Sequence, residues 1–255
     1  MLSIFNRKRQ YTDLSWMQVD MHSHILPGLD DGCRELPESL LLLERLEEMG
    51  LSQFYFTPHI FRELYPNSPA SIAPAFEQLR SAVNPIAKIG YAAEYMIDSS
   101  FDQLLADTSV ELLTLPGKHI LIEMSYIEES KQIEKTVFEL QVAGYKPILA
   151  HPERYVFYHR YPERIKYLRD IGCLLQVNLL SVYGYYGVSE KRIARQLMEY
   201  GWVDLVGTDV HHERHVKAIQ HGLKKEDISI HFKKCNIQNQ SLFGTNDRSR
   251  VMNHK

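Results

Sequence analysis

Short apolar runs alternate along this chain with longer stretches in which apolar residues recur every three or four positions. The short runs predict buried strands. These strands are expected to end at Asp20, Thr57, Glu94, Glu123, Ala150, Asn178 and Gly207. The helical spacing predicts helices over residues 37–49, 72–83, 130–143, 162–171 and 189–200. The glycines at positions 50, 144, 172 and 201 suit the C-terminal ends of four of these helices.

Repeated alternation of strand and helix favours parallel strands joined by right-handed crossovers. Seven such units predict a closed or nearly closed α/β barrel. No linker-like change in composition interrupts the pattern, so we expect a single domain. We assign residues 1–16 to an N-terminal extension and residues 17–222 to the barrel. Residues 223–255 are expected to form a C-terminal helix and tail that packs on the barrel or trails from it.

The composition narrows the class of protein. The chain has 255 residues, of which 44% are hydrophobic and 24% charged, as is ordinary for a globular domain. A net charge of −3 argues against a nucleic-acid partner. No apolar run approaches the roughly 18 residues of a membrane span. The first charges follow a very short apolar stretch, which is the wrong order for a signal peptide. Cys33, Cys173 and Cys235 are an odd, scattered set that fits a reducing cytoplasm.

The segment Asp20-Met21-His22-Ser23-His24 closes the first apolar run. Side chains alternate along a strand, so His22 and His24 are expected on the same side, where two imidazoles could ligate one metal ion. Such a pair alone is more typical of surface or hydrogen-bonded histidines. The metal interpretation therefore depends on further acids and histidines elsewhere in the chain.

Further potential ligands recur at the carboxyl ends of the predicted strands or in the loops that follow them. They are Asp31, His59, Glu94, Glu123, His151, Asp209 and His211. In α/β barrels this face carries the active site. Asp31 alone could be a turn former, and the two glutamates could form an ion pair with Arg154. Separate explanations for single residues do not account for acids and histidines that recur at one strand end after another. Together with His22 and His24 there are nine potential ligands, which favours two or three divalent metals bridged by a carboxylate.

At this point the residues resemble a known family. The motifs His-x-His, Asp-Asp-Gly, Thr-Pro-His, Ala-Glu, Ile-Glu, His-Pro-Glu-Arg and Asp-x-His resemble those of the PHP (polymerase and histidinol phosphatase) superfamily. Residues 22–32 and 150–155 are similar to the bacterial PHP-type tyrosine phosphatases of capsule and exopolysaccharide loci, the CpsB/YwqE type. The resemblance implies a distorted (β/α)7 TIM-like barrel with three divalent metals. Manganese or iron is expected there, with zinc as a further candidate.

The resemblance also implies a role for each residue. The first metal would be held by His22, His24, Glu94 and Asp209, the second by Glu94, Glu123 and His151, and the third by Asp31, His59 and His211. Glu94 would be the bridging carboxylate, and Arg154 would bind the phosphate. Glu94, Asp209 and Arg154 are thus the expected catalytic residues. A second arginine of the family follows the Asp-x-His motif; Arg214 is the candidate here, but its spacing differs and a solvated loop arginine is the alternative.

The implied activity is that of a metal-dependent protein-tyrosine phosphatase, in which a metal-activated hydroxide attacks the phosphorus without a covalent phosphoenzyme. The implied partner is the phosphotyrosine-bearing tail of a bacterial tyrosine kinase that controls polysaccharide export. A phenolate leaves with a parent pKa of about 10 and needs little help from a general acid. A cysteine mechanism requires an arginine six residues after the cysteine, but these positions hold Ser39, Leu179 and Ser241.

Two alternatives remain open at this stage. Another PHP phosphoesterase, such as a histidinol-phosphate phosphatase, would share the ligands but differ in substrate preference. A metal-stabilised binding module would have no catalysis, although its site would be expected to be closed. Residues after the second and sixth predicted strands could either pack the barrel rim or receive a phosphotyrosyl ring. They are the aromatic residues Phe61, Tyr65, Tyr183, Tyr185 and Tyr186, together with Pro66. The sequence leaves the oligomeric state undetermined.

Overall fold

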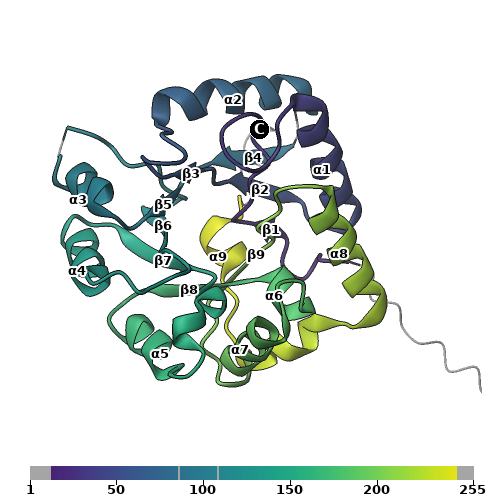
Figure 1. The fold of residues 1–255 in the computed structure, drawn as a ribbon. Helices are drawn as coiled ribbons and strands as arrows, with labels where there is room; N and C mark the ends of the chain where they lie inside the picture. The colour runs from purple at the N-terminus through teal and green to yellow at the C-terminus, as the bar shows by residue number, and fades with distance from the viewer. Residues whose placement is uncertain (1–12, 86, 108, 246–255) are drawn as a thin grey trace, which may run out of the picture.

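The strands of the described chain pair in parallel, as the alternation of strands and helices predicts. The computed structural model describes residues 13–245 except 86 and 108. Most of the expected N-terminal extension and the last ten residues of the expected tail lie outside this part. Helices surround a central group of strands (Figure 1), so the domain is mixed α/β. In the described residues, no helix has both the length and the apolar character to span a bilayer.

The strands belong to two sheets. The first has the order β1 (Val19–Asp20), β2 (Gln53–Phe56) and β4 (Lys88–Tyr91). The second has the order β3 (His59–Ile60), β5 (Glu94–Met96), β6 (His119–Glu123), β7 (Lys146–Ala150), β8 (Leu174–Asn178) and β9 (Leu205–Gly207).

Backbone hydrogen bonds join the two sheets beyond the carboxyl end of β1. On one side, the Asp209 N–H donates to the His22 carbonyl at 2.8 Å, and the His24 N–H donates to the Val210 carbonyl at 2.9 Å. On the other side, the Thr57 N–H donates to the carbonyl between the two histidines at 2.8 Å. The segment that carries His22 and His24 is therefore held between the ends of β9 and β2.

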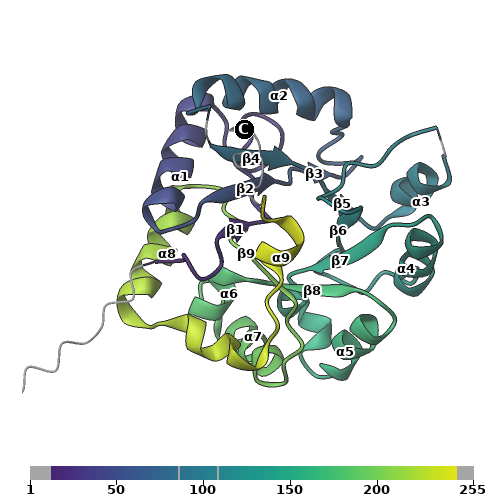
Figure 2. The same cartoon turned by 180° about the vertical axis from the view of Figure 1, so that it is seen from behind.

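Most helices lie around the outside of the strands, whereas α9 lies near the centre, beside β1 and β9 (Figures 1 and 2). Their bounds are α1 Leu36–Glu48, α2 Pro69–Ala82, α3 Ser99–Ala106, α4 Ile133–Val142, α5 Glu163–Asp170, α6 Leu179–Tyr183, α7 Val188–Glu199, α8 Glu213–Lys225 and α9 Asn239–Phe243. Short 3-10 turns span η1 Pro152–Arg154, η2 Val156–Tyr158 and η3 Ile228–Lys234. The outer helices bury one apolar face, as α7 does with Ile193, Leu197 and Met198, which is the burial expected of amphipathic helices.

The five expected helices correspond to α1, α2, α4, α5 and α7, and each begins and ends within three residues of its predicted bounds. The four glycines expected to end helices adopt positive φ angles of 70° to 110°. Helices α3, α6 and α8 were not predicted. Helix α8 runs through Gly222, where the barrel was expected to end. A Cβ there would lie 2.4 Å from Cδ1 of Tyr183, so this glycine permits close packing of α8 on α6 and does not end a helix.

Five predicted strand ends are confirmed, because Asp20, Glu123, Ala150, Asn178 and Gly207 are the last residues of β1, β6, β7, β8 and β9. Thr57 directly follows the last residue of β2. The prediction for Glu94 was wrong, since Glu94 is the first residue of β5. The strand is interrupted after β4, because the hydrogen-bonding partner changes: the Ala92 N–H donates to the Phe56 carbonyl, whereas the Glu94 N–H donates to the Pro58 carbonyl. This break sets Glu94 opposite His59 in the β3–β5 register.

Candidate active site

His22 and His24 lie side by side after β1, on the same side as their spacing predicts. Their Nε2 atoms are 3.3 Å apart, and both side chains are buried. Asp209, two residues after β9, places Oδ1 at 3.5 Å from Nε2 of His22 and 3.4 Å from Nε2 of His24. These three side chains present one ligand atom each within 4.8 Å of the others, which is compact enough to hold a metal ion.

Glu94 lies at the centre of the cluster. Its Oε2 is 3.2 Å from Nε2 of His22, 3.3 Å from Nε2 of His24 and 3.2 Å from Nδ1 of His59. Its other oxygen, Oε1, is 3.0 Å from Nε2 of His151. Burial alone would raise the pKa of this carboxyl, but His22 and His59 hold the pKa well below its usual range. Glu94 is thus an anion that faces four imidazoles.

Glu123, the last residue of β6, extends the cluster toward β3. Its Oε1 lies 2.8 Å from Nδ1 of His59, and together with Glu94 these residues form a second compact group of ligand atoms. His22, Glu94 and His151 form another. Glu94 therefore takes part in two groups that draw on different neighbours, as a bridging carboxylate would.

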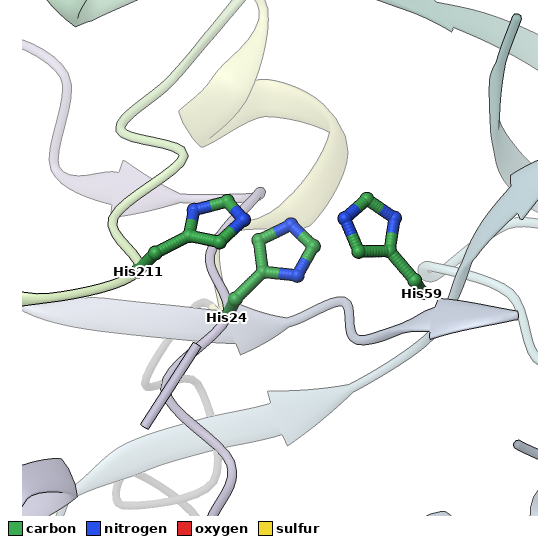
Figure 3. Close-up of side chains that lie close together, drawn as sticks. All are labelled: His24, His59 and His211. Carbon is green, nitrogen blue, oxygen red and sulfur yellow. The ribbon is translucent and has the colours of Figure 1, made fainter. Parts of the chain in front are cut away.

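His211 completes a third side of the cluster. Its ring stacks on that of His24 at a centroid distance of 3.9 Å. Figure 3 shows His24, His59 and His211, whose rings lie close together although the residues come from three distant parts of the chain. Asp31 is 56% exposed, and its Oδ1 is 3.7 Å from Nε2 of both His59 and His211. Asp31 thus lies at the edge of the cluster, beyond the compact groups found among the described residues.

Two site residues adopt left-handed backbone conformations. The φ angle is 35° at His151 and 51° at Asp209. For residues other than glycine such conformations cost about 1–3 kcal/mol and persist where the surroundings hold them. The bond from the Asp209 N–H to the His22 carbonyl supplies one such restraint. These backbone conformations direct both side chains into the cluster.

Three residues that the sequence did not single out orient the ligand candidates. Oδ2 of Asp30 is 2.7 Å from Nδ1 of His24, and Oε1 of Gln176 is 2.8 Å from Nδ1 of His22. Asn178 donates a side-chain hydrogen bond to Oδ2 of Asp209. Burial opposes ionisation of Asp30, but the neighbouring His24 lowers its pKa to about 2. Partners of this kind fix the ring and the nitrogen that a ligand presents.

Above the cluster is a cavity of about 550 Å³ that includes Arg154 in its lining. The Arg154 guanidinium carbon lies 4.6 Å from the ring centroid of Tyr126 and 4.0 Å from that of Tyr186. Its Nη1 donates to Oδ2 of Asp209 at 3.0 Å. Arg154 is therefore held by two aromatic rings and a carboxylate at the boundary between the cluster and the cavity. Arg214 is exposed on the first turn of α8 and does not belong to the described lining.

The residues expected at the rim divide into three sets. Phe61, Tyr65 and Tyr186 line the cavity together with Tyr126, which the sequence did not single out. Pro66 lines a neighbouring cavity instead. Tyr183 and Tyr185 are in neither described lining. Tyr126 follows β6 by three residues, so its position after a predicted strand was the one signal that could have identified it.

The cluster fits divalent metal ions by its own chemistry. Oε2 of Glu94 and Nδ1 of His59 are buried, and within the described residues neither has a hydrogen bond of suitable geometry. Buried polar atoms are normally satisfied, and an ion between these groups would satisfy both. Imidazole nitrogens and carboxylate oxygens together suit manganese, iron or zinc.

Comparison with known proteins agrees with this chemistry. The family model described as capsular polysaccharide synthesis, CpsB/CapC, matches residues 18–244. The tyrosine-protein phosphatase YwqE of Bacillus subtilis is 29% identical over 217 residues, which are 82% of this chain and 84% of that protein. The tyrosine-protein phosphatase CpsB of Streptococcus pneumoniae is 30% identical over 202 residues, which are 76% of this chain and 82% of that protein.

The fold is similar to a solved structure from a study of YwqE from Bacillus subtilis and CpsB from Streptococcus pneumoniae, which are described as unique metal-dependent tyrosine phosphatases. The TM-score is 0.72 at 26% sequence identity. The similarity covers 86% of this chain and 96% of that chain, so it includes most of both folds.

Proposed function

The chain belongs to the capsular polysaccharide synthesis family CpsB/CapC, and we propose that it is a metal-dependent phosphatase that hydrolyses phosphotyrosine in proteins. The observation that carries this proposal is the buried cluster around Glu94 beneath a cavity that contains Arg154. The cluster supplies ligands for metal ions, and the arginine supplies a binding group for phosphate.

We propose three divalent ions, manganese or iron, in the arrangement that the family resemblance implies. His22, His24, Glu94 and Asp209 would hold one, Glu94, Glu123 and His151 the second, and Asp31, His59 and His211 the third. When bound, such ions neutralise phosphate charge and lower the pKa of water toward neutrality. The compact group of His22, His24 and Asp209 supports the first of these sites, and the two compact groups that share Glu94 support its role as the bridge. Asp31 would have to move closer to His59 and His211 to take part.

Arg154 is proposed to bind the phosphate. A guanidinium presents a planar fork of donors that matches two phosphate oxygens. The rings of Tyr126 and Tyr186 keep this fork at the cavity, and Asp209 holds one of its donors. Catalysis is thus assigned to Glu94, Asp209 and Arg154, of which the arginine alone contacts the substrate directly.

The cavity suits an aryl phosphate better than an alkyl one. Phe61, Tyr65, Tyr126 and Tyr186 provide flat apolar surface for a phenyl ring. A phenolate leaving group has a parent pKa of about 10 and requires little protonation as it departs. A site rich in metal ligands, with no dedicated acid identified among the described residues, therefore favours phosphotyrosine.

We propose further that residues 17–222 form a distorted barrel of the PHP type with seven strand–helix units, preceded by an extension and followed by a C-terminal segment. The hydrogen bonds between residues 22–24 and 209–210 support closure. The proposed substrate is the phosphotyrosine-bearing tail of a bacterial tyrosine kinase in the cytoplasm. The capsule-synthesis family and the tyrosine phosphatases among its relatives support this assignment.

Hydrolysis of phosphotyrosine, phosphoserine and histidinol phosphate tests the proposal directly. We expect phosphotyrosine turnover that disappears with a chelator and returns when manganese is added. Turnover of histidinol phosphate alone would favour the alternative PHP phosphoesterase. No turnover of any of the three by metal-loaded protein would contradict the proposal and favour a binding module.

A further inference from the structure

A second cavity of about 440 Å³ adjoins the first one, and Met96 at the end of β5 belongs to both linings. It lies between the chain after β3 and helix α3. Its apolar lining residues are Ile60, Tyr95, Met96, Phe101 and Leu104. The lining also includes the polar residues Asn67, Ser100 and Gln103 and two exposed charged residues of opposite sign, Arg62 and Asp107. The chemistry of this cavity thus favours an uncharged apolar group.

The segment from Ile60 to Asn67 separates the two cavities. Phe61, Leu64 and Tyr65 line the first cavity, whereas Ile60, Arg62, Pro66 and Asn67 line the second. Mutual backbone hydrogen bonds close the segment between Phe61 and Tyr65. The Asn67 side chain also donates to the carbonyls of Leu29 and His59 at 2.8 and 2.9 Å. The segment that separates the two cavities is therefore held against the strand that carries His59.

This segment also carries an exposed apolar side chain beside the first cavity. Leu64 is 66% exposed at the first cavity, and Ile127, across that cavity in the loop after β6, is 90% exposed. A polypeptide whose phosphotyrosine enters the first cavity can contact these exposed side chains. An extended chain rises about 3.3 Å per residue, so two or three residues are enough to cross a wall one side chain thick.

We propose that the second cavity binds a large apolar side chain that flanks the phosphotyrosine of a polypeptide substrate, while the phosphotyrosyl ring occupies the first cavity. This inference rests on the proposed function and adds a sequence preference to it. The second cavity contains no histidine in its described lining, so it binds the flanking residue without taking part in chemistry.

Phosphotyrosyl peptides that carry leucine, phenylalanine or alanine at each flanking position test the proposal. At one position we expect leucine or phenylalanine to raise kcat/KM roughly tenfold over alanine, as filling one apolar pocket does. Gln103 is exposed on α3, lines the second cavity and accepts a hydrogen bond from Arg62. A Gln103→Trp substitution should fill the cavity and remove the preference. The matched control Ala106→Trp, exposed on the same helix outside both linings, should retain it.

Thermal unfolding of both tryptophan variants shows whether the fold is kept. Equal kcat/KM for all peptides with the wild-type chain would overturn the proposal. So would a preference that survives Gln103→Trp with an unchanged unfolding temperature. Peptides in which a non-hydrolysable phosphonate replaces the phosphotyrosine allow the same comparison without turnover. The Kd for the leucine or phenylalanine peptide is then compared with the Kd for the alanine peptide. A lack of phosphotyrosine hydrolysis would therefore count against the proposed function, whereas equal Kd values would overturn the role of the second cavity.

Discussion

At the scale of single residues, the site depends on side chains that hold the ligand candidates in place. Asp30 accepts hydrogen bonds from the backbone N–H groups of Gly32 and His59 and lies against Nδ1 of His24. One buried carboxylate therefore fixes two candidate ligands and the loop between them. The sequence identified Asp31 as a potential ligand, but its pattern carries no information about supporting partners such as Asp30.

The first prediction concerns Asp30→Asn. An amide keeps the size of the side chain but places an N–H group where only acceptors are needed, so we expect metal affinity to fall about 10- to 100-fold. Competition with a metal-binding dye measures the affinity without relying on activity. The control Glu35→Gln alters an exposed acid nearby and should leave the affinity unchanged. Equal affinities for Asp30→Asn and wild type would contradict the supporting role.

The second prediction concerns Arg154→Lys. Lysine keeps the positive charge but loses the planar fork and the stacking on Tyr126 and Tyr186. We expect kcat/KM for phosphotyrosine to fall at least about tenfold, equivalent to about 1.4 kcal/mol. Arg214→Lys, at an exposed position on α8, should cause a much smaller loss. A comparable loss in both variants would instead identify Arg214 as the second phosphate-binding arginine.

At the scale of elements, local sequence signals predicted what depends on local physics. Helices such as α1 and α7 follow from apolar spacing and a terminal glycine, and both are determined within about a dozen neighbouring residues. The five confirmed strand ends follow in the same way from apolar runs. These signals were enough to place most ligand candidates at one face, because parallel strands share the direction of their carboxyl ends.

The elements that the sequence did not reveal depend on distant partners. Glu94 begins a strand because the chain changes its hydrogen-bonding partner from Phe56 to Pro58, and no local pattern records this change. Gln176 contacts His22 across 154 positions. Helix α8 was missed because Gly222 and a polar sequence resemble an end, although its glycine serves close packing on Tyr183.

The third prediction belongs to helix α9. Asn239 is buried, accepts from the Val206 N–H at 3.0 Å and donates to the carbonyls of Val19 at 2.8 Å and Val206 at 2.6 Å. Asn239→Leu would leave these backbone groups unsatisfied, so we expect the free energy of unfolding to fall by about 2–4 kcal/mol. Urea unfolding measures the loss. The neighbouring exposed residue provides the control Gln240→Ala, and equal stability of the two variants would contradict the proposed bridge.

At the scale of the whole molecule, function and support occupy opposite ends of the strands. Most metal-ligand candidates lie at or just after the carboxyl ends of β1, β6, β7 and β9, where backbone strain at His151 and Asp209 is tolerated. His59 and Glu94 join them from the first residues of β3 and β5. The amino ends of β1 and β9 are closed by α9, and β6 begins there with His119 against Phe243. Substitutions at the end closed by α9 should therefore change the free energy of unfolding without changing the chemistry of the site.

His119 makes this separation testable through pH. Burial lowers its pKa and the charge of Lys146 lowers it further, against the opposing effect of the Pro116 carbonyl. The folded state therefore prefers neutral His119. Its contribution to stability is complete above the unfolded pKa of about 6.5 and is lost as the pH falls below that value. Between about pH 8 and pH 5, wild-type protein should lose more free energy of unfolding than His119→Asn, which cannot titrate.

Urea unfolding of metal-free protein across this pH range provides the measurement. Site histidines titrate in both proteins, so their contribution cancels in the difference between wild type and His119→Asn. The exposed histidine on α8 supplies the control, because His221→Asn should follow the wild-type pH dependence. If His119→Asn lost as much stability on acidification as wild type, His119 would not be held neutral by the fold, and the acid sensitivity would belong to the cluster around Glu94.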